Sequence, residues 1–239
     1  MRNYLILIFI LSALLPGIAS GQMASGKLDA TGYAGYATYK MEMLKELNQS
    51  VEESLPFEVK SVNNFDPAFY FGAAVQSRLS HIFSVGLVFQ YHTTGSRIGQ
   101  KDYSGSYTFD QIANCYLAAV RAEISILDKK SYTLSASVTS GALFTGLDIY
   151  ESFILFETEN NTSATFSAVS AAIYPAANFS VPVTHRFIWF LSLGRMFDTG
   201  GKVHLSDNKD AVLKVNEKTV NTGWSGWSIS SGLKFIIIK

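Results

Sequence analysis

The stretch Gly223-Trp-Ser-Gly-Trp-Ser-Ile-Ser-Ser-Gly-Leu-Lys-Phe-Ile-Ile-Ile-Lys239 alternates between two kinds of side chain. Odd positions carry Trp227, Ile229, Leu233, Phe235 and Ile237, and even positions carry Gly226, Ser228, Ser230, Gly232 and Lys234. Successive side chains of a strand point to opposite faces, so this period of two predicts a strand with one apolar face and one small or polar face. A strand of this length and pattern is typical of the closing strand of a membrane β-barrel.

The other end of the chain has the layout of a secretory signal peptide. A short basic start precedes an apolar run from Tyr4 to Leu15. Pro16-Gly17 ends this run, and the small residues Ala19, Ser20 and Gly21 offer a cleavage site. These features predict a cleaved signal peptide over residues 1–21 and a barrel domain over residues 22–239. An uncleaved membrane anchor is the alternative, but the apolar run is shorter than the roughly 20 residues that a spanning helix needs. A signal peptide followed by a membrane β-barrel predicts export to the outer membrane of a Gram-negative bacterium.

The composition fits a barrel better than a helical or α/β enzyme. Charged residues make up 16% of the chain, aromatic residues make up 13%, and the net charge is +0. A balanced charge gives no indication of nucleic-acid binding. Cys115 is the single cysteine, which excludes an intrachain disulfide.

Seven further segments repeat the period of two. They are residues 28–39, 69–78, 82–94, 111–126, 132–145, 166–183 and 187–196, and the sixth contains Pro175, which weighs against a fully paired strand. Short polar turns alternate with longer connections at residues 40–66, 95–110, 146–165 and 199–222. This alternation predicts an all-β, eight-stranded antiparallel transmembrane barrel with short periplasmic turns and long extracellular loops. In the first long connection, Met41, Leu44 and Val51 follow helical spacing until Leu55-Pro56, which predicts a short amphipathic helix.

A secreted soluble barrel of the lipocalin type would also alternate, with its apolar face turned inward. Here the polar face consists mainly of Gly, Ala, Ser and Thr, which is too poor in charge for a soluble exterior. Aromatic residues collect at strand ends on the apolar face, as in the interfacial girdles of membrane barrels: Phe69, Tyr91, Tyr132, Phe187 and Trp227. The sequence therefore favours lipid outside and polar side chains inside.

The terminal pattern Ser230-x-Gly232-x-x-Phe235-x-Ile237 resembles the carboxy-terminal signal by which outer-membrane barrels are recognised for insertion, although two residues follow it. With the leader and the eight strands, the chain resembles the small OmpA/OmpX/OmpW-type barrels. Residues 35–45 and 101–110 are similar to uncharacterised barrels of the Bacteroidetes group. The resemblance implies contact with outer-membrane lipid or lipopolysaccharide, and insertion by the barrel-assembly machinery.

An eight-stranded barrel is just wide enough for its side chains to fill the interior. The alternation turns Arg78, Arg121, Glu123 and Lys234 inward, and Asp29 joins them if the first strand faces that way. Because unpaired buried charges are costly, we expect a paired cluster that plugs the lumen and has a structural role. Further polar side chains in the lumen are Gln76, Gln90 and His92.

Three functions remain open at this stage. The main expectation is envelope structure or surface binding, in which long extracellular loops on a rigid scaffold recognise an unidentified extracellular ligand. A narrow channel, or a lateral exit near Pro175 for small hydrophobic molecules, is the alternative.

The third function is a lipid A-modifying enzyme. It would need His92 beside Thr94 or Ser96, with Glu151 or Asp148 as the orienting acid. No residue spacing indicates a metal site or a cofactor, and residues 198–210 do not match a known Ca²⁺ loop.

Overall fold

The computed structural model describes residues 28–103, 105–156 and 158–238. The predicted signal peptide at residues 1–21 lies outside the described residues. Among the helices of the described part, none is long and apolar enough to cross a membrane.

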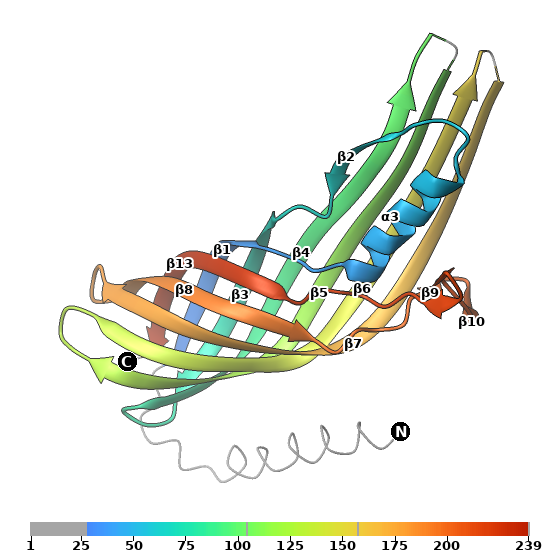
Figure 1. Cartoon of the computed structure of the whole chain (residues 1–239). Coiled ribbons are helices and arrows are strands. Elements are labelled where there is room, and N and C mark those ends of the chain that lie inside the picture. The colour runs from blue at the N-terminus through green and yellow to red at the C-terminus, as the bar shows by residue number, and fades with distance from the viewer. Residues whose placement is uncertain (1–27, 104, 157, 239) are drawn as a thin grey trace.

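Eight strands form one closed antiparallel ring (Figure 1). In chain order they are β1 (Leu28–Ala37), β3 (Ala68–Arg78), β4 (Phe83–Lys101), β5 (Gly105–Asp128), β6 (Thr133–Leu155), β7 (Thr158–Pro182), β8 (Phe187–Asp198) and β13 (Gly226–Ile238). Each ring strand pairs with the next one along the chain, and β1 closes the ring against β13 from Leu28↔Ile238 to Ala37↔Ser228. The predicted eight-stranded antiparallel barrel is confirmed, and closure leaves the ring without an unpaired edge in the bilayer.

Three tight turns lie at the same end of the barrel as the two strand ends that close it. Backbone hydrogen bonds hold the turns, from Leu79 to Phe83, from Lys129 to Tyr132 and from Val183 to Phe187, each at 2.9 Å between N and O. Short turns are the periplasmic feature of such barrels, so this end is periplasmic and the opposite end is extracellular.

The outer face of the ring is apolar and the inner face is polar. Phe69, Phe89 and Tyr116 are 67%, 59% and 61% exposed, whereas the inward-facing Gln76 and His92 are each 2% exposed. A barrel in water would have the reverse arrangement, so the soluble alternative is wrong. The medium that matches this surface is lipid.

Strands β4 to β7 continue beyond the ring at its extracellular end, as Figure 1 shows. We call residues 95–110 and 146–165 of these strands the protruding sheet; its pairing extends to Lys101↔Ser106 and Leu155↔Thr158. The prediction of loops at these two segments is therefore wrong over most of their length. Beyond the membrane the outer face meets water, so the buried apolar residues Ile98, Tyr107 and Phe109 lie on the inner face.

Helix α3 (Glu42–Ser54) packs against the inner face of the protruding sheet, in agreement with the predicted helix. Leu47 and Val51 of α3 pack against the cluster formed by Ile98, Tyr107 and Phe109. After the helix, β2 (Lys60–Asn64) adds to the edge of β4 through Lys60↔Gly99 and Asn64↔Ser96. The first extracellular connection is thus a folded cap.

The last extracellular connection contains β9 (His204–Leu205), β10 (Asn208–Val212), β11 (Lys214–Val215) and β12 (Lys218–Thr219). Strand β9 pairs with β7, and β11 pairs with β12. Val203, Val220 and Trp224 of this segment are at most 1% exposed and belong to the same apolar core as Leu44 of α3. Both ordered connections therefore meet above the lumen.

Candidate functional site

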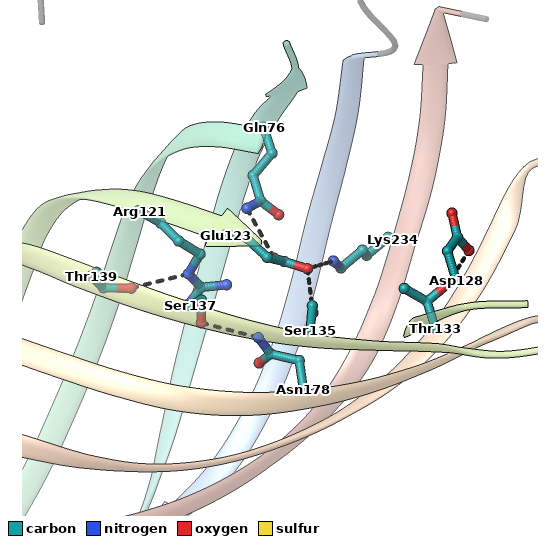
Figure 2. Close-up of polar contacts among 10 residues, drawn as sticks. All are labelled: Gln76, Arg121, Glu123, Asp128, Thr133, Ser135, Ser137, Thr139, Asn178 and Lys234. Atoms are coloured by element: carbon teal, nitrogen blue, oxygen red, sulfur yellow. Dashed lines mark hydrogen bonds and ion pairs between the residues drawn. The ribbon is translucent and has the colours of Figure 1, made fainter. Parts of the chain in front are cut away.

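An ion pair lies in the periplasmic half of the lumen (Figure 2). Glu123 of β5 and Lys234 of β13 lie 3.4 Å apart, and their side chains are 11% and 12% exposed. Ser135 donates to the same carboxylate oxygen at 2.7 Å, and Gln76 donates to the other oxygen at 3.3 Å. Four strands are thereby connected through one carboxylate, which stabilises the ring from inside.

The other predicted lumen charges do not join that pair directly. Arg121 is buried and donates from Nε to the Thr139 hydroxyl at 3.0 Å, as Figure 2 shows. Asp29 faces the lumen, and its Oδ1 is buried without a hydrogen-bond partner among the described residues. Arg78 lines the periplasmic mouth beside Asp29, in a cavity of ≈ 230 Å³ that is open at that end. Asp29 and Arg78 line the same cavity as Glu123 and Lys234. Among the described lumen residues, the Glu123–Lys234 ion pair therefore has further charges around it that form no ion pair with it.

Tyrosine rings fill the middle of the lumen, and each ring packs against a glycine of the neighbouring strand. A Cβ atom added to Gly72 would meet the Tyr33 ring, and one added to Gly35 would meet the Tyr70 ring. The two tyrosine rings contact each other edge to face at 6.4 Å between centroids. Glycine leaves room on one strand for an aromatic ring from the neighbouring strand, so the lumen is filled without widening the barrel.

A second barrier lies near the extracellular rim and is centred on His92. The Tyr39 hydroxyl is 3.0 Å from His92 Nδ1, and His92 Nε2 is 3.0 Å from Gln90 Oε1. An amide oxygen only accepts, so Nε2 carries the proton and Nδ1 accepts from Tyr39. Tyr70 stacks on the imidazole at 4.7 Å, and Trp224 packs on Tyr39 at 5.0 Å. This septum closes the lumen, and both ring nitrogens of His92 have hydrogen-bond partners within it.

The arrangement does not assemble the catalytic triad that the sequence left open. Both ring nitrogens of His92 are engaged by Tyr39 and Gln90, whereas Thr94 donates to the Asp66 carbonyl at 3.1 Å and Ser96 to Asn48 at 3.3 Å.

The two candidate acids are engaged elsewhere. Glu151 accepts from Tyr107 at 3.0 Å, and Asp148 accepts from Thr165 at 2.8 Å. Among the described residues, the candidate hydroxyls, His92 and the two acids therefore do not meet at one position, because each is part of a separate structural contact.

Pro175 interrupts one ladder, as the sequence suggested. It pairs with Val138 of β6, but the β7–β8 register passes from Ile173↔Phe197 directly to Ala176↔Gly194. Proline has no N–H to donate, so the interruption falls on the β8 side. The adjacent Tyr174 is buried and its hydroxyl is 2.9 Å from the Ser228 hydroxyl, which closes the inner side of this position.

The residues of the predicted insertion signal divide between the two faces of β13. Ser230 is buried in the lumen, and a Cβ atom on Gly232 would meet Tyr33. Phe235 and Ile237 face outward and are 36% and 51% exposed. Phe235 contacts Phe187 of β8 at 5.2 Å between ring centroids.

The protruding sheet is the part of the surface that sequence reasoning missed. Asn48 of α3 lies at its centre and accepts from Gln111 at 2.6 Å and from Ser96 at 3.3 Å. Burial raises the pKa of Tyr107, and its hydrogen bond to Glu151 raises that pKa further, so this phenol stays a neutral donor. The helix is thereby anchored to β4 and β5 through polar as well as apolar contacts.

Large aromatic side chains remain exposed around this cap. Tyr103 and Phe156, at the ends of the two hairpins, are 100% and 75% exposed, and Phe153 and Phe57 are 39% and 36% exposed. These aromatic residues could have been noticed in the sequence, because the segments predicted as polar loops contain more apolar residues than polar loops usually do.

The closed ring, the apolar outer belt and the filled polar interior define an outer-membrane β-barrel of the small, eight-stranded class. Solved structures of outer-membrane proteins have a similar fold. The attachment invasion locus protein Ail of Yersinia pestis is 14% identical, with 89% of this chain and 100% of that chain covered and a TM-score of 0.35.

For the outer membrane protein OprG of Pseudomonas aeruginosa, the identity is 12%, the coverage is 90% of this chain and 97% of that chain, and the TM-score is 0.44. For the outer membrane protease OmpT of Escherichia coli, the identity is 10%, the coverage is 90% and 98%, and the TM-score is 0.37. These values are too low to carry a function from any of the three to this chain. No protein-family model and no curated protein matches the sequence.

Proposed function

We propose that this barrel is a surface-binding protein whose protruding sheet and helical cap recognise an extracellular partner. The observation that carries the proposal is the complete exposure of Tyr103 and the 75% exposure of Phe156 at the ends of two hairpins that project from the membrane. Large aromatic rings held away from the lipid are costly in water, and they are the side chains enriched where proteins bind partners.

Rigidity of the projecting part supports the proposal. The two hairpins are joined from Gly105↔Leu155 downward, so they form one sheet with two tips. Helix α3 stiffens this sheet from its inner side through Asn48, Gln111 and the apolar cluster around Ile98. A binding surface that is already ordered loses less conformational entropy when its partner arrives.

Because its lumen is filled, the ring serves in this proposal to hold the protruding sheet in the membrane and does not serve as a channel. The Glu123–Lys234 layer and the His92 septum are two separate barriers along the axis. A pore for polar solutes would need both to open, and a lateral exit at Pro175 would need Tyr174 to leave its contact with Ser228. Binding at the extracellular cap requires neither change.

Retention of cells that display the protein tests the proposal. Cells with the wild-type protein, with Tyr103→Ser/Phe156→Ser or with the control Asp207→Ser/Lys209→Ser, two exposed residues of the last extracellular connection, are washed over surfaces coated with collagen, with mucin or with albumin. We expect the control to behave as the wild type, and the aromatic double variant to lose at least about fivefold in retention on the surface that binds, since each buried aromatic anchor contributes about 1 kcal/mol or more. Equal retention of the aromatic variant and the wild type on every surface would contradict the proposal.

A further inference from the structure

An arginine lies on the lipid-facing side of the barrel, outside both the lumen and the protruding sheet. Arg195 alternates along β8 with the inward-facing Gly194 and Met196, so its side chain is directed outward. Its neighbours on the outer face are Leu193 and Phe197 in β8 and Trp227 in β13, with exposed fractions of 55%, 48% and 56%. The guanidinium is therefore surrounded by side chains that face lipid.

The height of Arg195 places it near the extracellular surface of the bilayer. At a rise of about 3.3 Å per residue and a tilt of about 40°, it lies about 20 Å above Phe187 at the periplasmic end of the same strand. The apolar belt of such barrels is about 25 Å tall, so this position falls at the headgroup side of the outer leaflet. Trp227 beside it is typical of the aromatic girdle at that level.

The guanidinium is held against aromatic rings and has no protein anion. Its Cζ lies 5.0 Å from the centroid of the Phe197 ring and 5.4 Å from that of the Trp227 ring. Nε is buried without a hydrogen-bond partner among the described residues, and no carboxylate in that part of the chain forms an ion pair with Arg195. The nearest acid along the strand, Asp198, instead accepts hydrogen bonds from Gly200, Thr222 and Trp224.

An arginine that merely escaped the lipid would extend toward water, away from neighbouring rings. Arg195 is instead fixed between two rings beside Pro175, whose lack of an N–H interrupts the adjacent ladder. A cation fixed in a lipid-facing site marks a functional position, because it needs an anion that the surrounding medium supplies. At headgroup level that anion is a lipid phosphate, whose geometry matches the guanidinium fork.

We propose that Arg195, clamped by Phe197 and Trp227, binds the terminal phosphate of an anionic lipid in the outer leaflet. The two aromatic rings orient the guanidinium, and its terminal N–H groups donate to the phosphate oxygens. The site fixes one lipid at the β8–β13 face of the barrel. It is independent of the partner-binding role of the protruding sheet, which lies beyond the membrane.

Quenching of tryptophan fluorescence by brominated lipid tests this site, because Trp227 is part of it. The full-length protein is reconstituted in phosphatidylcholine vesicles that contain either brominated phosphatidic acid, which carries a terminal phosphate, or brominated phosphatidylcholine at the same mole fraction. We expect the wild type to favour phosphatidic acid about fivefold, as one basic residue at an anionic headgroup provides. Arg195→Gln abolishes this preference, Arg195→Lys retains part of it, and Arg97→Gln, which removes an arginine of the protruding sheet, leaves it unchanged.

Three outcomes would overturn the assignment. The first is a wild-type protein that shows equal quenching by the two lipids, and the second is an Arg195→Gln protein that keeps the wild-type preference. The third is loss of the preference when inorganic phosphate is added to the buffer, which would assign the site to free phosphate in place of a lipid. The heat-dependent gel mobility of each variant verifies that the barrel is folded before the lipids are compared.

Discussion

Replacement of Lys234 by methionine tests the energetics of the lumen most directly. The change removes the cation that lies 3.4 Å from Glu123 while it keeps most of the aliphatic stem. Removing one member of a buried ion pair costs about 3–5 kcal/mol, because the remaining charge is uncompensated. Glu123 retains hydrogen bonds from Ser135 at 2.7 Å and from Gln76 at 3.3 Å, so we expect the lower end, about 3 kcal/mol.

Urea unfolding of the reconstituted barrel, followed by tryptophan fluorescence, measures this loss. A decrease of about 3 kcal/mol corresponds to a midpoint lower by about 1.5 M at a slope of about 2 kcal/mol per molar urea. Adding Glu123→Gln to Lys234→Met removes the stranded charge and should recover about 2 kcal/mol, which defines the coupling between the two groups. Lys101→Met, a change of the same kind in an exposed lysine, is the matched control. A Lys234→Met midpoint equal to that of the control would refute the reasoning.

Other features of the barrel give further expected outcomes. Gly72→Leu places a side chain against the Tyr33 ring and should lower the free energy of unfolding by about 1–3 kcal/mol in the same urea assay. The control Gly32→Leu, which has no atom near its added Cβ, should cause no such loss. Equal losses in the two variants would contradict the packing role of Gly72. Asn48→Ala leaves its donors unpaired and should raise protease cleavage within α3 severalfold while the urea midpoint of the ring stays constant, since about 1–3 kcal/mol is lost only locally. Phe235→Ser should reduce the heat-modifiable, inserted fraction of the protein in membranes, and an unchanged fraction would disprove its role in the insertion signal. The purified protein should show no steady large conductance in planar bilayers, and a stable open level would overturn the filled lumen.

The ring could be predicted from the sequence because a bilayer imposes one rule on every strand. Between the two interfaces the outer residue must be apolar and the inner one small or polar, so Phe89 and Gln90 indicate their faces without further information. The same rule located Glu123 and Lys234 in the lumen. It does not identify hydrogen-bond partners, because the distance between two inward side chains depends on strand tilt and register, so the contact of Arg121 with Thr139 could not be predicted.

The protruding sheet could not be predicted because its alternation is reversed. In β5 the apolar residues Ile112, Tyr116 and Val120 occupy even positions and face lipid, whereas Tyr107 and Phe109 occupy odd positions and face α3. In lipid the apolar side chains of a strand face outward, whereas in the water beyond the membrane they face inward toward α3. The alternating pattern in the sequence therefore changes phase where the strand leaves the membrane, and this change resembles the end of the strand. The tertiary contact with α3, which supplies the reason for the reversal, lies far away in the sequence.

The pairing of β1 with β13 has a consequence for the kinetics of assembly. The other seven ring pairings join strands that follow one another along the chain, so each can form by local hairpin growth. The seam from Leu28↔Ile238 to Ala37↔Ser228 joins the most distant strands of the ring and carries the largest loop-closure entropy. We therefore expect an open, curved sheet with two reactive edges to precede the closed ring, and closure of this seam to be the slow step. During that interval, the seam is where the edge of another unfinished barrel could add in place of the correct strand.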